Sequence, residues 1–153
     1  MWKMKRFLCI VLTLAILLSL TACDSSSQTT IDQCEWTLNT IQSDSNGGEV
    51  VACAADYVES YPNAAEVDFS CTASEGALTL TDYASGQVYS GTYAENTATG
   101  DSLLYTVQFD DNTGNATSAL TKYADGGSAP TLVLSVDGYT MYFTGQGKGG
   151  DAK

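Results

Sequence analysis

Apolar and polar residues alternate with a period close to two along most of the chain after residue 33. In the stretch that begins at Cys34, the side chains of Cys34, Trp36 and Leu38 alternate with polar ones. This pattern is typical of a strand with one buried face. Similar alternation or a short apolar run predicts strands over 34–38, 49–53, 67–73, 78–80, 88–93, 103–109, 119–123, 132–136 and 139–143. The pattern over 54–61 fits either a short helix or a further strand.

Turn residues separate these segments at intervals of about 8–12 positions. Asp137-Gly138 is the strongest turn signal, because both residues suit the left-handed geometry of a two-residue type I′ hairpin. Polar residues over 95–102 and 110–115 predict a loop and a further turn. The sequence therefore predicts an antiparallel all-β domain of about eight or nine strands, an up-and-down meander that forms a barrel or a sandwich. Sequential hairpins favour the barrel.

The first 20 residues have the layout of an export signal. Lys3, Lys5 and Arg6 precede a mostly apolar run from Phe7 to Leu20. A positive segment followed by about 7–15 apolar residues is typical of a secretory signal peptide. A membrane-spanning helix needs about 20 apolar residues, so this run is too short to be one.

The small residues Thr21 and Ala22 then lead directly to a cysteine, with Leu20 three positions before it. The segment Leu20-Thr21-Ala22-Cys23 resembles the lipobox of bacterial lipoproteins. The resemblance implies cleavage between Ala22 and Cys23 and a diacylglyceryl group on the Cys23 thiol. It further implies an extracytoplasmic protein, anchored to the membrane by acyl chains such as palmitate.

Charge after the signal is strongly negative. Residues 23–153 contain all eighteen acids of the chain and only three lysines, a net charge of −15. Nucleic acids and anionic headgroups need a positive face, so we expect no nucleic-acid partner. Residues 23–33 are polar and predict a flexible tether, residues 34–144 the barrel domain, and 145–153 a flexible glycine-rich tail.

Three cysteines remain besides the one in the signal and the one in the lipobox. Outside the cytoplasm a disulfide is permitted. Cys53 and Cys71 lie symmetrically about the turn signal Pro62-Asn63, so pairing of the flanking arms would bring them together. We predict a Cys53–Cys71 disulfide and a buried thiol at Cys34.

The sequence lacks histidine and the motifs of common active sites, and its many acidic residues show no spacing that marks a catalytic pair. The chain has no histidine, no Cys-x-x-Cys pair and no Gly-x-Ser-x-Gly elbow. We therefore predict no catalytic residue, no metal site and no cofactor. Binding is the expected mode of action.

The order of motifs resembles the small lipocalin-like lipoproteins of Firmicutes. The likeness rests on Trp36-Thr37-Leu38, on Ser90-Gly91-Thr92-Tyr93, and on Pro130-Thr131-Leu132 before the last aromatic strand. It implies a barrel that binds a small apolar or amphipathic ligand.

Aromatic residues suggest where such a ligand would lie. An eight-stranded barrel is just wide enough to be filled by side chains or to hold one small molecule. We expect Trp36, Tyr93, Tyr105 and Tyr139 to line the cavity. The alternative is an envelope structural or protein-interaction module with a packed barrel and a working outer face.

Overall fold

Strands make up most of the described protein. The computed structural model describes residues 28–148. The elements, in chain order, are β1 (Cys34–Ser43), η1 (Asp44–Asn46), β2 (Glu49–Cys53), η2 (Ala55–Tyr57), β3 (Ala65–Glu66), β4 (Phe69–Ser74), β5 (Ala77–Asp82), β6 (Gln87–Thr99), β7 (Ser102–Phe109), β8 (Asn112–Lys122), β9 (Ser128–Val136) and β10 (Tyr139–Gly147). The prediction of an all-β domain is confirmed, and the undecided segment 54–61 contains one short 3-10 turn.

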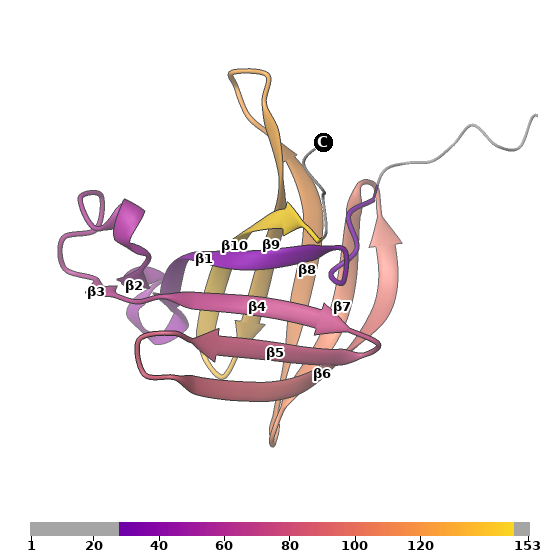
Figure 1. The fold of residues 1–153 in the computed structure, drawn as a ribbon, viewed down its shortest axis with the longest axis horizontal. Helices are drawn as coiled ribbons and strands as arrows, with labels where there is room; N and C mark the ends of the chain where they lie inside the picture. The colour runs from indigo at the N-terminus through magenta and orange to yellow at the C-terminus, as the bar shows by residue number, and fades with distance from the viewer. Residues whose placement is uncertain (1–27, 149–153) are drawn as a thin grey trace, which may run out of the picture.

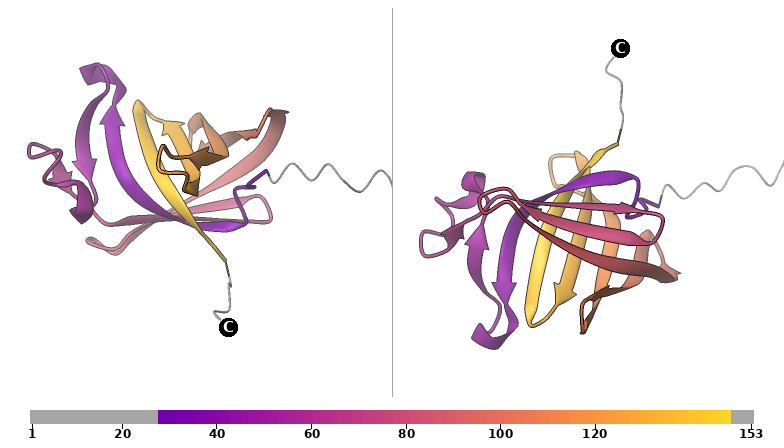
Figure 2. Two further views of the ribbon diagram at one scale, coloured as in Figure 1. Left: turned by 90° about the horizontal axis from the view of Figure 1, so that it is seen from above. Right: turned by 60° about the horizontal axis from the view of Figure 1, so that its bottom comes forward.

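Eight of these strands close into an antiparallel barrel (Figure 1). Strands β4 to β10 pair in sequence as a meander, and β1 pairs with both β4 and β10. Closure leaves no free edge between β1 and β10. The short strands β2 and β3 extend the sheet beyond the barrel wall, next to the second half of β1 (Figure 2). The up-and-down barrel predicted from the hairpins is confirmed.

Strand β1 pairs with two different strands along one of its edges. Its first half pairs with β4, where Trp36 faces Cys71, and its second half pairs with β2, where Thr40 faces Cys53. The register with β10 shifts between Leu38 and Thr40. A bulge of this kind bends a strand and increases its twist. The bend lets β1 close the barrel and also hold the β2–β3 extension.

Strand β6 corrects the prediction of a polar loop over 95–102. The strand continues to Thr99, and its second half pairs with β7 while its first half pairs with β5. The polar side chains of this half are exposed, which is why their composition resembles a loop. The change of partner occurs at Gly91, where a Cβ would lie 2.5 Å from the carbonyl oxygen of Gln108. The turn predicted over 110–115 is shorter, because β8 already begins at Asn112.

Inward-facing side chains from all eight barrel strands form one apolar core. The core is built from residues that alternate along the strands, as the sequence pattern predicts. Its largest fully buried side chains are Trp36, Tyr105, Phe143, Ile31, Leu38, Leu78, Leu132, Leu134 and Val107.

The two ends of the barrel differ. One end, which we call the open end, is formed by the turns β5–β6, β7–β8 and β9–β10 and by the bend of β1 toward β2. The other end, which we call the closed end, contains the turns β4–β5, β6–β7 and β8–β9 and the segment 28–33. In Figure 1 the open end lies at the lower left and the closed end at the upper right.

The segment before β1 seals the closed end. Ile31 is only 1% exposed and belongs to the core. Its backbone N–H donates to the hydroxyl of Tyr105 (3.1 Å), and its carbonyl oxygen accepts from the indole N–H of Trp36 (2.8 Å). The Ser118 hydroxyl donates to the carbonyl oxygen of Thr29 (2.6 Å). Residues 29–31 are thus fixed to the barrel, whereas the sequence predicts that they belong to a flexible tether.

The C-terminal boundary also lies beyond the predicted one. Strand β10 runs to Gly147, so residues 145–147 belong to the barrel rather than to a tail. The Lys148 ammonium donates to the carbonyl oxygen of Ala73 (2.6 Å), and the Lys148 backbone N–H donates to that of Gln33 (3.0 Å). The signal peptide 1–22, the lipobox with Ala22 and Cys23, and the segment 149–153 lie outside the described residues.

Candidate ligand pocket at the open end

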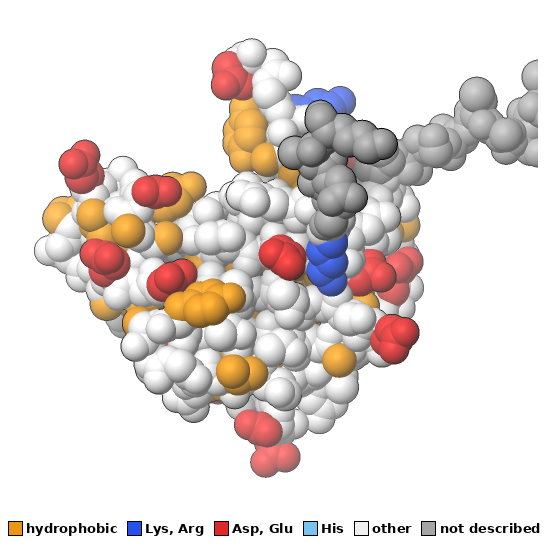
Figure 3. Space-filling model, viewed as in Figure 1, with side chains coloured by type: hydrophobic (Ala, Val, Ile, Leu, Met, Phe, Trp, Pro, Cys, Tyr) orange, Lys and Arg blue, Asp and Glu red, His pale blue; other side chains and the backbone are white. Residues whose placement is uncertain are grey.

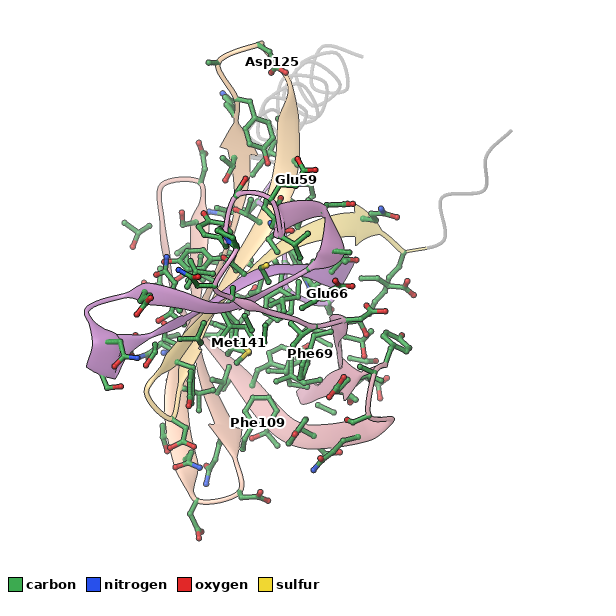
Figure 4. All side chains as sticks on the ribbon, turned by 90° about the vertical axis from the view of Figure 1, so that its left-hand side faces the viewer. Glu59, Glu66, Phe69, Phe109, Asp125 and Met141 are labelled. Carbon is green, nitrogen blue, oxygen red and sulfur yellow. The ribbon has the colours of Figure 1, made fainter. Side chains whose placement is uncertain are left out.

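The open end of the barrel contains a pocket of about 540 Å³. Its apolar wall is formed by Ile41, Phe69, Leu80, Phe109, Val136 and Met141. A pocket of this volume is within the range of small-molecule sites, which are lined mainly by apolar and aromatic side chains. Figure 4 shows Phe69, Phe109 and Met141 around this opening, with Asp125 far away at the tip of the β8–β9 hairpin.

Each wall residue occupies the end of a strand that faces the opening. Phe69 begins β4, Phe109 ends β7 and Val136 ends β9. Met141 and Ile41 face each other across the β1–β10 pair, close to the point where β1 turns away to β2. These side chains belong to the core or pack against it, and their outer sides line the pocket.

The rim of the pocket is acidic. Asp110 and Asp137 line it from the β7–β8 and β9–β10 turns. Both residues have positive φ, 49° and 53°, which Asp and Asn tolerate better than most residues. Asp137-Gly138 forms the predicted two-residue hairpin, with Gly138 at φ 77° and Val136 facing Tyr139. The turns that set the strand register therefore also place two acidic residues at the pocket rim.

Positive charge lies elsewhere among residues 28–148. The described lysines are Lys122, at the far end of β8, and Lys148, after β10. Both belong to the closed end. Figure 3 shows the blue side chains near the β8–β9 hairpin and the end of β10, while red side chains are spread over the visible face. The pocket mouth thus faces carboxylates without a described lysine or arginine among its lining residues.

Only one of the four aromatic residues predicted to line a cavity is found at the pocket. Tyr139 lines its mouth and is 47% exposed. Trp36 and Tyr105 are buried in the core of the closed end, where they bond to Ile31. Tyr93 is half-buried and meets Tyr105 edge to face, with ring centroids 5.8 Å apart. Burial is the main cause that raises the pKa of Tyr93, which stays a neutral phenol.

The sequence pattern identifies only some of the residues that line the pocket. Phe69, Phe109 and Met141 continue the inward alternation of their strands, so the sequence pattern places them inside. The pattern does not tell which end of the barrel a plug fills. The position of the pocket follows from Ile31, which fills the opposite end and lies outside the predicted barrel.

The predicted disulfide is not present in the structure. Cys34, Cys53 and Cys71 are all buried free thiols. The arms on either side of Pro62-Asn63 meet only in the short parallel pair of β2 with β3, where Cys53 faces Glu66. Cys53 and Cys71 each lie on a strand that pairs with β1, at Thr40 and at Trp36 respectively. A strand advances about 3.3 Å per residue, and a disulfide needs Cα atoms within about 7 Å. The two thiols are therefore at different points along β1, not opposite one another.

Burial also affects the ionisation of Cys34 and Cys71. It raises the pKa of Cys71 to about 12, and it raises the pKa of Cys34, with nearby Lys148 partly opposing both shifts. A thiol that stays protonated is a poor nucleophile and a poor metal ligand. The described residues contain no group of three or more Cys, Asp or Glu side chains arranged to hold a metal ion. Nor does any helix between residues 28 and 148 have the length and apolar character to cross a membrane.

Comparison with known proteins yields no match to a protein-family model, to a curated protein or to a solved structure.

Proposed function

We propose that this protein is a lipid-anchored lipoprotein of the cell envelope whose barrel binds a small apolar or amphipathic molecule at its open end. It acts by binding and not by catalysis. The observation that supports the binding role best is the pocket of about 540 Å³ with an apolar wall, in a barrel whose other half is solid. An eight-stranded barrel is either filled by side chains or holds one small ligand, and the pocket at the open end favours the second case.

The lipobox supports the anchor. Cys23 would receive the diacylglyceryl group, and two acyl chains are enough for stable membrane attachment. Only residues 24–28 separate Cys23 from Thr29, whose carbonyl oxygen is bonded to Ser118 at the closed end. Because a chain spans at most about 3.6 Å per residue, the closed end would be held within about 20 Å of the anchor. The pocket mouth would then face away from the membrane.

The ligand role is tested with the soluble chain 24–153, which retains every residue of the described fold. N-phenyl-1-naphthylamine, a neutral apolar dye that fluoresces in apolar surroundings, serves as the probe. We expect saturable binding that Ile41→Trp abolishes by filling the pocket. Val133→Trp is the matched control, since it also replaces a β-branched, half-buried residue but is not part of the pocket wall. Equal binding by both variants would contradict the proposed site.

Native mass spectrometry of the same chain, exported without its anchor, would identify a natural ligand by extra mass that is lost on denaturation. The anchor is tested separately in the full-length chain. We expect Cys23→Ala to move the protein from the membrane fraction to the soluble extracytoplasmic fraction. Unchanged membrane retention would contradict lipidation at Cys23.

A second role, in protein interaction, is favoured by apolar side chains on the outer surface. Tyr83 and Val88, on either side of the β5–β6 turn, are 62% and 55% exposed. Exposed apolar side chains that form a continuous patch mark candidate contact surfaces, and these two residues are candidates for such a patch. If the dye does not bind and Tyr83→Ser abolishes capture of an envelope protein by the full-length chain, this second role is the better account.

A further inference from the structure

We propose that the pocket selects cationic amphiphiles: molecules with an apolar body and a quaternary or protonated amine that stays at the mouth. This inference rests on the proposed binding function and names the class of ligand for that same pocket. It follows from the charges at the rim, the aromatic rings beside them and the position of the described lysines.

Charge at the rim is of one sign. Asp110 and Asp137 are the charged residues among those that line the pocket. Among residues 28–148, no lysine or arginine lines the pocket beside these carboxylates, since Lys122 and Lys148 are at the closed end. An amphiphile that inserts its apolar body brings its head group to these two residues. A cationic head is attracted there, and a sulfate or carboxylate head is repelled.

Aromatic rings at the mouth favour the same class. Tyr89 and Tyr139 are both partly exposed and line the pocket, with Phe109 beside Asp110. The faces of aromatic rings attract cations, and quaternary ammonium groups are recognised in this way by aromatic side chains. Carboxylates and rings together suit a head group that is positive and weakly hydrated. An apolar wall behind them suits an alkyl or aryl body.

The overall charge of the chain does not explain this selectivity by itself. Acids are also present at the closed end, for example Asp101 in the β6–β7 turn and Asp125 in the β8–β9 hairpin. A general attraction of cations would depend on all of them equally. Selection by the pocket depends on Asp110 and Asp137 alone, so paired variants separate the two explanations.

The experiment compares three amphiphiles with the same decyl chain and different heads: trimethylammonium, sulfate and tetra(ethylene glycol). Each is used below its micelle concentration to displace N-phenyl-1-naphthylamine from the soluble chain 24–153. We expect decyltrimethylammonium to displace the dye at the lowest concentration and decyl sulfate at the highest. The preference should weaken as salt is added, because the rim is exposed to solvent.

The double variant Asp110→Asn with Asp137→Asn removes the rim charge and keeps side chains that tolerate positive φ. We expect it to weaken binding of decyltrimethylammonium about tenfold more than it changes binding of the neutral dye. The control is Asp101→Asn with Asp125→Asn, which changes the net charge equally at the closed end. It should bind all three amphiphiles as the original chain does.

Equal displacement by the three heads, or equal losses in the two double variants, would overturn the cationic preference while the bound dye still supports the pocket. Absence of dye binding, together with absence of binding of decyltrimethylammonium by calorimetry, would overturn both the pocket and its preference. Tighter binding of decyl sulfate than of the cation would reverse the inference.

Discussion

The indole N–H of Trp36 donates to the carbonyl oxygen of Ile31, 2.8 Å away and five residues earlier in the chain. On the other side of the same residue, the Ile31 N–H donates to the Tyr105 hydroxyl, so strands β1 and β7 hold one peptide segment between them. Each of these bonds is buried. Loss of one partner therefore leaves a buried polar group without a hydrogen bond, which costs about 1–3 kcal/mol.

We expect Tyr105→Phe to lower the free energy of unfolding by about 1–3 kcal/mol, since it leaves the Ile31 N–H unpaired. Urea unfolding followed by Trp36 fluorescence measures this change. Tyr142→Phe is the control, because its hydroxyl bonds to Gln42 in a part-buried position at 3.3 Å and its loss should cost less than about 0.5 kcal/mol. Equal costs in the two variants would contradict a sealing role for the segment around Ile31.

Glycine at position 145 gives a second test of the closed end. Gly145 faces Trp36 in the β1–β10 pair, and a Cβ there would lie 2.7 Å from an indole carbon. We expect Gly145→Ala to destabilise the fold by about 1–3 kcal/mol, because the ring must move within a packed core. Gly147→Ala, two residues further along β10, meets nothing within 4 Å and should be near neutral. Thermal unfolding of both variants distinguishes a steric effect from a general loss of glycine flexibility.

How well the sequence predicts a feature of this structure depends on how far apart in the chain the residues that define the feature lie. Asp137-Gly138 is a local signal, and it forms the expected hairpin because two residues suffice to define the turn. Pairing of Cys53 with Cys71 needed a longer-range assumption, that the arms around Pro62-Asn63 meet. The arms meet only in the short parallel β2–β3 pair, and the bend in β1 places Cys53 and Cys71 at different points along the same edge. No local pattern in the sequence indicates this arrangement.

The candidate site was predictable to a similar degree. Alternation identifies which side chains face inward but not how far along the barrel the interior is filled. That depends on Ile31, a single apolar residue in an otherwise polar segment, whose burial requires Trp36 and Tyr105 to offer hydrogen bonds to its backbone. Composition alone assigns such a segment to a flexible tether.

Titration of Cys71 predicts how stability changes in alkali. Because burial raises the folded-state pKa to about 12 from an ordinary value of 9.0, the thiol is protonated in both states below pH 9 and its contribution is then complete. Above pH 9 the unfolded chain ionises first, so the contribution declines as pH rises toward 12, by up to about 1.4 kcal/mol per pH unit. Other side chains also ionise at alkaline pH. The contribution of Cys71 is therefore measured as a difference from a variant that lacks this thiol.

The quantity to measure is the difference in free energy of unfolding between the original chain and Cys71→Ala, from urea titrations at pH 8, 9, 10 and 11. We expect this difference to be constant up to pH 9 and to shrink above it. Cys53→Ala is the control, as a second buried thiol at a different point along β1. A difference that stays constant to pH 11 would contradict a protonated Cys71 in the folded state, and a native Cys53–Cys71 disulfide would give the same constant result.

The orientation of the barrel on a membrane provides the last prediction. If Cys23 is lipidated, the short segment 24–28 holds the closed end near the bilayer, since Thr29 is already bonded to Ser118. A fluorophore attached at Asp101→Cys, in the closed-end turn β6–β7, should be quenched by lipids that have a spin-labelled head group. The same fluorophore at Asp137→Cys, at the pocket mouth, should be quenched much less. The native thiols should react slowly with the label, because Cys34, Cys53 and Cys71 are all buried. Equal quenching at the two positions would mean that the barrel lies on its side or tumbles freely on its anchor. Stronger quenching at Asp137→Cys would place the pocket mouth against the membrane, where the pocket would collect ligands from the bilayer itself.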